Sequence, residues 1–307
     1  GSPVTFSGTA NASGNWGDTN NWVAGVVAYG TNATALFTNA LTADRVANNG
    51  FTTLPLGNLV FGSPTNNWTI TNNTIRLDVL SGTPTVTVAT NTATISSVLA
   101  GAQGLMKSGP GTLVVAASGS YSGATTVAAG TLQYAGNGSP YQAGTQPGQI
   151  TVNNSASLSF NRSDAMGAHT SYPAALLTLE AGSMAQNTGV AFTTLRNLTL
   201  NGGELRANGG NGTTWPAYQL KGTVTVSGAS ASLVSAYAIA NGQHQIQLGN
   251  NITNGSTTFD VADVTGNDAA DLVVNAGFAD GRAPAGTFPL VTSGFNKRGP
   301  GTMKLGG

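Results

Sequence analysis

Five of the eleven acidic residues lie close together near the carboxyl end of the chain. Carboxylates gathered in this way offer the hard oxygen ligands that Ca²⁺ prefers. Their order fits neither the EF-hand loop nor the glycine-rich calcium nonapeptide. We therefore favour the alternative, in which they are solvated turn carboxylates or charged gatekeepers beside strands, and Ca²⁺ binding stays open. The five are Asp260, Asp263, Asp268, Asp271 and Asp280.

Carboxylates in the middle of the chain are the next candidates, because some β-helix proteins cleave polysaccharides. Glycosidic cleavage needs two carboxylates that flank the bond, and elimination needs carboxylate-bound Ca²⁺ with a basic residue. The middle of the chain offers Asp164, Glu180 and Glu204, without an Asp-Asp pair or an Asp-x-x-Asp spacing. Arg162 and His169 are close to Asp164 in sequence, but a surface turn explains this trio more simply. The sequence thus predicts no catalytic residues and no enzyme.

Metal and cofactor sites have equally little support. His169 and His244 lie 244 − 169 = 75 residues apart, which is not the spacing of a zinc site, and the chain has no cysteine. No Gly-x-Ser-x-Gly motif occurs on a strand-to-helix turn. The paired glycines at 202–203 and 209–210 are not followed by a helix, as a phosphate-binding loop requires. We expect no metal site and no cofactor.

Aromatic residues give the sequence its one binding hypothesis, since exposed rings in a row stack on sugars. The alternative is that Trp16 and Trp22 cap the amino end of a repeat structure, whose terminal units need covering. We favour capping and packing, and expect residues 215–218 to form a protruding loop. The candidates are Trp16, Trp22, Trp68, Trp215, Tyr218 and Tyr237.

Composition excludes several other classes. Charged residues make up 7% of the chain, against roughly 25% in ordinary soluble domains, and the net charge is zero. Lys and Arg are scattered, apart from Lys297-Arg298, so neither a nucleic acid nor a polybasic membrane contact is expected. No apolar run approaches the roughly 20 residues that span a bilayer. With 40% hydrophobic residues the chain is folded rather than disordered.

Short alternating segments separated by glycine and asparagine turns predict an all-β fold. Residues 85–88, 157–160, 176–179, 198–200 and 223–226 are examples. Small residues and Asn at many turns favour a solenoid with side-chain ladders over a sandwich or barrel. One helical turn is expected near residues 163–168.

An internal repeat supports this architecture. The segment from Lys107 to Leu113 (KSGPGTL) returns from Lys297 to Met303 (KRGPGTM), 297 − 107 = 190 residues later. Proline fixes one backbone angle in the Gly-Pro-Gly turn, and the glycines allow the left-handed region. Two further glycine-ended strands follow the first copy.

Residues 105–135 closely resemble the passenger-associated transport repeat, also called the autotransporter-associated β-strand repeat. The resemblance rests on the segments at 105–115 (LMKSGPGTLVV), 121–127 (YSGATTV) and 129–133 (AGTLQ), and a truncated copy covers 295–307. It implies export, a right-handed parallel β-helix, and display at or beyond the bacterial outer membrane. Family passengers include adhesins, filaments and, more rarely, enzymes.

The sequence therefore predicts a right-handed parallel β-helix (β-solenoid) with an amino-terminal capping segment. Residues 1–80 would hold the cap and first coils, and residues 81–307 the solenoid with a full repeat (105–135) and a truncated one (295–307). We expect an extracellular structural protein of the cell surface, forming or extending a stalk or self-associating fibre. The alternative is an adhesin that binds glycan or a host surface. Its partners would be other copies of itself and surface glycans, with no membrane span in this segment.

Overall fold

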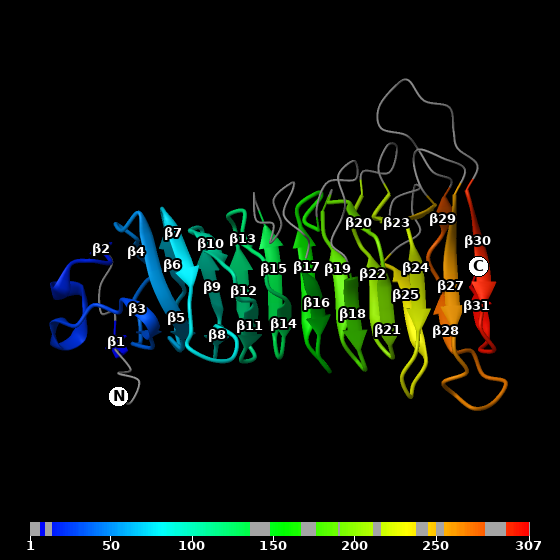
Figure 1. Ribbon diagram of the computed structural model, residues 1–307, viewed down its shortest axis with the longest axis horizontal. Coiled ribbons are helices and arrows are strands. Elements are labelled where there is room, and N and C mark those ends of the chain that lie inside the picture. Colours follow the sequence, from blue (N-terminus) through cyan, green and yellow to red (C-terminus); the bar gives the residue numbers. More distant parts are fainter. Residues whose placement is uncertain are drawn as a thin grey trace, which may run out of the picture. The chain divides into compact units, whose positions relative to one another are not determined.

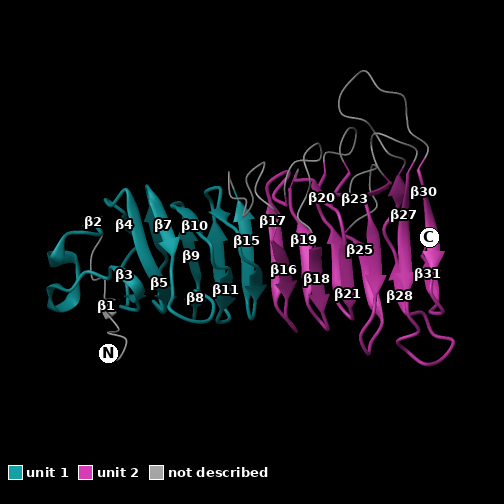
Figure 2. Ribbon diagram, viewed as in Figure 1, with its two compact units in different colours: residues 1–145 teal, residues 146–307 magenta. Residues whose placement is uncertain are grey.

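The structure is a computed structural model in which the chain forms two compact units, residues 1–145 and 146–307 (Figure 2). The predicted boundary at residue 80, between the cap with its first coils and the rest of the solenoid, remains a proposal. The structure describes residues 7–9, 14–135, 148–166, 176–189, 191–210, 216–237, 245–249, 255–279 and 293–306.

Unit 1 is built from stacked coils of short parallel strands (Figure 1). The long strand β5 (Thr53–Phe61) belongs to two ladders, because its first half pairs with one strand and its second half with another. On one side run β7 (Thr74–Leu77), β10 (Val98–Gly101) and β13 (Ser120–Tyr121). On the other run β1 (Ser7–Thr9), β3 (Gly30–Phe37), β8 (Thr85–Val88), β11 (Leu105–Ser108) and β14 (Thr125–Val127).

A further parallel ladder closes each coil of unit 1. Two side-chain hydrogen bonds between adjacent coils join residues 24 and 21 positions apart in the sequence, so these coils take somewhat over 20 residues. The strands of this ladder are β2 (Gly14–Asn15), β4 (Arg45–Asn48), β6 (Trp68–Thr71), β9 (Thr92–Ile95), β12 (Thr112–Val115) and β15 (Thr131–Ala135).

Unit 2 repeats this plan with three parallel ladders. The first contains β16 (Gln149–Val152), β18 (Leu176–Glu180), β21 (Leu198–Asn201), β24 (Thr223–Val226), β27 (Ser256–Val261) and β30 (Gly294–Arg298). The second contains β17 (Ser157–Asn161), β19 (Met184–Asn187), β22 (Glu204–Ala207), β25 (Ser232–Ala236), β28 (Leu272–Val274) and β31 (Met303–Leu305). The third contains β20 (Thr193–Leu195), β23 (Tyr218–Leu220), β26 (Ile246–Leu248) and β29 (Phe278–Ala279).

The cores of both units follow from the alternation seen in the sequence. Strands β8, β9, β12 and β24 all alternate half-buried and buried residues, because successive side chains point to opposite faces. The register then stacks inward residues of successive coils. In unit 1 Leu113 lies between Ala93 and Leu132, and none of the three is exposed. Burial of one such leucine contributes about 1.5–3 kcal/mol.

The outward positions form polar ladders, as the sequence predicts. Thr178, Thr199 and Thr225 are in register on three successive coils of unit 2. In unit 1 the Asn48 amide donates to Asn15 Oδ1 at 3.2 Å, and the Asn72 amide donates to Asn48 Oδ1 at 2.5 Å. These contacts bond coils through side chains as well as through the backbone.

Two tryptophans cover the amino-terminal coil of unit 1. The indole of Trp16 donates to Ala28 O at 2.8 Å, and its ring centroid lies 5.5 Å from that of Phe37. Trp22 donates to Trp16 O at 2.6 Å. The short 3₁₀ turn η1 (Thr19–Asn21) lies between them and begins after Asp18, whose carboxylate accepts from Asn20 N. A second 3₁₀ turn, η2 (Val23–Gly25), follows Trp22 directly. The predicted capping segment is present.

Two local expectations were wrong. The predicted helical turn near 163–168 is a plain turn over the described residues 163–166. Tyr218 does not protrude, because it opens strand β23 and is fully buried together with Ala217. Trp215 lies outside the described residues. Among the described residues, no helix is long and apolar enough to cross a membrane.

Candidate interaction site at the repeat turns

Lys107 is buried inside the solenoid, in the repeat of unit 1. It lies at an inward position of β11, two residues after the buried Leu105, so the strand alternation directs its side chain into the core. In register it lies between Val86 and Val127 of the two adjacent coils. A lysine among valines must find hydrogen-bond acceptors, because an uncompensated buried charge is costly.

The ammonium of Lys107 finds two backbone carbonyls. It donates to Gly109 O of its own turn at 2.7 Å and to Ala129 O of the next coil at 2.8 Å. Burial lowers the pKa of Lys107 from 10.5 to about 8. The side chain therefore joins two successive coils at the turn of the repeat.

The repeat turn requires glycine for two reasons: the backbone angle φ is positive, and there is no room for a Cβ atom. Gly109 has φ +76°, and a Cβ there would lie 2.4 Å from Val88 O. Gly130, in the next coil, has φ +65°, and a Cβ would lie 2.5 Å from both Gly109 O and Gly111 O. The turns of successive coils thus stack backbone on backbone, a contact that no side chain permits.

The second repeat, in unit 2, has the same turn. Lys297 Nζ donates to Gly299 O at 2.7 Å, as Lys107 does to Gly109. Gly299 has φ +75°, and its Cβ would lie 2.4 Å from Val261 O. The backbone N–H of Gly301 donates to Val261 O at 2.9 Å. Lys297 differs from Lys107 in being exposed, since it lies on strand β30 at the edge of its ladder.

One member of the acidic cluster holds this second turn in place. Asp271 is 1% exposed and accepts backbone hydrogen bonds from Val264 N and Thr265 N, both at 2.8 Å, and from Thr302 N at 2.7 Å. Burial alone would raise the pKa of Asp271, but these N–H donors outweigh it and hold the pKa below the ordinary 3.8. The prediction of solvated carboxylates is wrong for this residue.

The other acids of the cluster are not gathered around a common point. Asp260, Asp263 and Asp268 are exposed. Asp263 accepts from Gly266 N at 2.7 Å, which closes a local turn. Asp280 lies outside the described residues. In the described part of the chain, no group of three acidic or histidine side chains is placed to hold a metal ion.

The central carboxylates are engaged in ladders on different faces of unit 2. Glu180 on β18 accepts the amide of Asn201 at 3.1 Å. Glu204 on β22 forms a bidentate ion pair with Arg206, at 2.9 and 3.0 Å. The two belong to separate ladders, and each carboxylate is engaged by a neighbouring side chain.

Of the trio around residue 164, the structure describes Arg162 and Asp164. Asp164 follows β17 in a turn, where its backbone N–H donates to Phe192 O at 2.9 Å. Burial lowers the pKa of Lys221, and the charge of Asp164 partly offsets this. Asp164 therefore acts on a lysine of a later coil. His169 and His244 lie outside the described residues.

The aromatic candidates are mostly buried, which confirms the packing interpretation for them. Trp16 and Trp68 are 1% exposed, Trp22 is 4% exposed and Tyr218 is fully buried. Tyr237, at the end of β25, is 72% exposed. The described residues therefore do not include a row of these rings on the surface.

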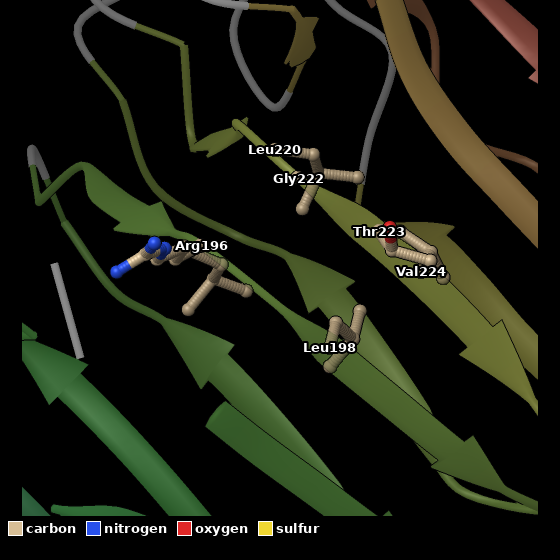
Figure 3. Close-up of a pocket in the computed structure, with 7 residues that line it drawn as sticks. Arg196, Leu198, Leu220, Gly222, Thr223 and Val224 are labelled. Carbon is tan, nitrogen blue, oxygen red and sulfur yellow. The ribbon is translucent and has the colours of Figure 1, made fainter. Parts of the chain in front are cut away.

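A shallow hollow lies at one corner of unit 2, where β20 leads into β21 and β23 leads into β24 (Figure 3). Its volume of about 120 Å³ includes space open to solvent. Binding pockets for small molecules are about 300–1,000 Å³ and mostly enclosed, so this corner does not suit one. It is lined by Leu195, Arg196, Leu198, Leu220, Gly222, Thr223 and Val224.

Sequence reasoning did not anticipate the roles of Lys107 and Asp271. For Lys107 the signal was present: it occupies an inward position in an alternating strand, two residues before the first glycine of a Gly-Pro-Gly turn. For Asp271 the partners Val264 and Thr302 are 7 and 31 residues away in the sequence. No local pattern indicates such a contact.

Comparison with known proteins agrees with this geometry. Residues 105–133 match the family model of the passenger-associated-transport-repeat. Over 111 residues, which are 33% of this chain, the sequence is 34% identical to the adhesin BmaC autotransporter of Brucella suis biovar 1 (strain 1330). The match covers 3% of that relative's length. No solved structure matches significantly. The resemblance and the parallel β-helix predicted from the sequence are confirmed.

Proposed function

We propose that this autotransporter-like chain, which carries the passenger-associated transport repeat, is a length of secreted passenger displayed at the bacterial cell surface. There its β-solenoid serves as a structural stalk. The observation that carries the proposal is the in-register parallel pairing of each described strand with its neighbours in both units. In such a structure stability accumulates from coil to coil, so length can be added without a new core.

The surface chemistry supports a structural role. Outward columns such as Thr178, Thr199 and Thr225 are uncharged and hydrogen-bonding, which keeps a long β-structure wettable without mutual repulsion. Among the charged residues at outward positions, Glu204 and Arg206 neutralise each other. The engagement of Glu204 by Arg206, and of Glu180 by Asn201, supports a protein without catalytic activity.

Self-association into a fibre is the further part of this proposal. A parallel solenoid presents an unpaired ladder edge wherever its coils stop, and such edges accept strands from other chains. If the contact does not close on itself, a filament results. Negative-stain microscopy of the purified chain tests this: we expect regular filaments. Monodisperse particles at all concentrations would contradict the fibre hypothesis, and the stalk hypothesis would stand.

An adhesin is the second candidate function. It is favoured by the name of the relative, an autotransporter adhesin, and by the exposed ring of Tyr237. A glycan array with the purified chain separates the candidates. Saturable binding that is lost in Tyr237→Ala would support the adhesin, whereas binding to no glycan would leave the structural role.

A further inference from the structure

Two positively charged side chains occupy the same position on successive coils of unit 2. Arg196 directly follows β20, and Lys221 directly follows β23. Leu195 and Leu220, the last residues of these strands, are in register, and Lys221 N donates to Leu195 O at 2.9 Å. Because adjacent strands of a sheet lie about 4.8 Å apart, the two basic residues are neighbours along one corner of the solenoid.

This arrangement of like charges needs an explanation, because like charges on neighbouring strands lower stability. Two other arginines of the chain are paired with a carboxylate two residues away: Arg76 with Asp78, and Arg206 with Glu204, both at 2.9 Å. Within the described parts of the chain, the guanidinium of Arg196 has no such partner. Arg196 is exposed, so its charge is available to a ligand in solution.

Lys221 is half-buried at the same corner. Burial lowers the pKa of Lys221, and the negative charge of Asp164 partly offsets this. Asp164 lies next to the preceding coil, since its backbone N–H donates to Phe192 O. Two cations thus stand against the one carboxylate that acts on Lys221, so the corner carries a net positive charge.

The remaining surface of the corner is polar. Leu195, Leu198 and Leu220 line the shallow hollow but are only 2%, 1% and 2% exposed. Asn197 is exposed, and its side-chain oxygen accepts from Thr223 N at 3.4 Å. Figure 3 shows Arg196 on one coil and Thr223 on the next, along the same corner. The corner therefore offers charge and hydrogen bonds, with almost no apolar surface.

These properties exclude several kinds of ligand. A protein partner would need apolar or aromatic anchors that become buried. An anionic membrane is recognised by clusters of about 4–8 basic residues, and a nucleic acid by a longer basic stripe. A small molecule would need a more enclosed pocket. An acidic polysaccharide has anionic groups and hydroxyls along an exposed chain, and it needs no enclosed pocket.

We propose that the Arg196–Lys221 corner is a contact site for an acidic polysaccharide. The planar guanidinium of Arg196 pairs with a carboxylate or sulfate of one sugar, and Lys221 adds positive charge from the next coil. Asn197 and Thr223 hydrogen-bond to sugar hydroxyls. This rests on the adhesin, the second candidate function above, and deepens it, because it names the class of glycan and the residues that bind it.

A fluorescein-labelled oligogalacturonate, which carries one carboxylate on each sugar, is the first probe. We expect saturable binding to the full chain in an anisotropy titration, and affinity should fall about fivefold between 50 and 200 mM NaCl. Arg196→Gln should weaken binding at least tenfold. Lys304→Gln is the matched control, because it removes an exposed lysine elsewhere in unit 2, and it should bind like the native chain.

Further variants and probes make the test specific. Arg196→Lys keeps the charge without the planar fork, so its affinity should lie between those of the native chain and Arg196→Gln. Hydrogen exchange of the amides at 196–198 and 221–223 should slow when the oligogalacturonate binds. A heparin oligosaccharide provides sulfates: tighter binding than to oligogalacturonate would identify sulfate as the preferred group, and weaker binding would identify carboxylate. Neutral dextran should not compete.

Four results would overturn the proposal. They are equal affinity of Arg196→Gln and the native chain, equal competition by dextran, binding of phosphatidylglycerol vesicles without binding of either oligosaccharide, and binding of no glycan at all. The proposed functions are tested separately. Glycan binding that is lost in Tyr237→Ala but kept in Arg196→Gln would support the adhesin and contradict this corner. Filaments without glycan binding would leave the structural role intact.

Discussion

The ammonium of Lys107 donates a 2.8 Å hydrogen bond to the carbonyl of Ala129, which lies 22 residues further along the chain and one coil further along the solenoid. Backbone ladders hold coils together along their strands. This contact instead joins them at a turn, where the ladder is interrupted. The lysine thereby joins two turns that stack closely at their glycines, Gly109 and Gly130.

Replacement of this lysine tests the strength of the contact. Lys107→Met keeps the length and the apolar stem but leaves Gly109 O and Ala129 O without their donor. We expect the free energy of unfolding to fall by about 1–3 kcal/mol at pH 7. Urea unfolding followed by circular dichroism measures this, with the exposed Lys304→Met as control. Equal stability of the two variants would show that solvent satisfies the carbonyls.

The same residue predicts a pH dependence with a definite sign. The pKa of Lys107 is lowered to about 8, whereas in the unfolded chain it returns to about 10.5. Between these values the unfolded chain binds more protons, so stability rises with pH. After allowance for solvent screening, we expect the native chain to gain about 1 kcal/mol over Lys107→Met from pH 8 to pH 10. Thermal unfolding of both proteins across this range measures it. A constant difference would contradict the lowered pKa.

The close stacking of the turns predicts a severe effect from one methyl group. Gly130→Ala introduces a Cβ 2.5 Å from two carbonyl oxygens at a residue with φ +65°. We expect unit 1 to lose more than about 2 kcal/mol of stability. Gly50→Ala is the matched control, because a Cβ there meets no atom within 4 Å. If Gly130→Ala and Gly50→Ala unfold at the same urea concentration, the prediction is wrong.

The sequence predicted the ladders well, because a solenoid repeats local information. Alternation in segments such as Thr223–Val226 determines which residues are buried, and the repeat at Lys107 determines the turn. Contacts between residues of adjacent coils that are far apart in the sequence were not predictable. In the sequence Asp271 is one of several nearby acidic residues, and only the fold shows that Thr302 N donates to its carboxylate. Tyr218 comes two residues after Pro216, which favours a loop, but strand β23 pairs with a strand on each side.

Asp271 supplies an acid-side prediction. Its pKa is lowered in the folded chain, so the stability it contributes is complete above the unfolded pKa of about 4 and is lost as pH falls through the folded value. We expect Asp271→Asn to lower the melting temperature by several degrees at pH 7, because an amide oxygen accepts the three N–H groups less strongly. The difference in melting temperature between the native chain and Asp271→Asn should become smaller below pH 4.

Two checks accompany the Asp271 measurement. Asp268→Asn changes an exposed residue of the same cluster, and it should have the same melting temperature as the native chain at pH 7. Addition of Ca²⁺ or of a chelator should shift neither protein, since the carboxylate is already occupied by backbone donors. A rise in melting temperature with Ca²⁺ that disappears in Asp271→Asn would instead establish a metal site at this residue.

The tryptophan cap predicts where the solenoid begins to unfold. Trp16→Ala removes a ring that is 1% exposed, together with its hydrogen bond to Ala28 and its contact with Phe37. We expect a loss of about 3–5 kcal/mol in unit 1. Hydrogen exchange should accelerate first in β3 and β4, because a solenoid without its cap exposes the core of its terminal coil. Tyr237→Ala, at a ring that is 72% exposed, should leave exchange and stability unchanged. Uniform acceleration through unit 1 after Trp16→Ala would show that its coils unfold as one cooperative body, and that the tryptophans contribute to the whole core rather than closing its end.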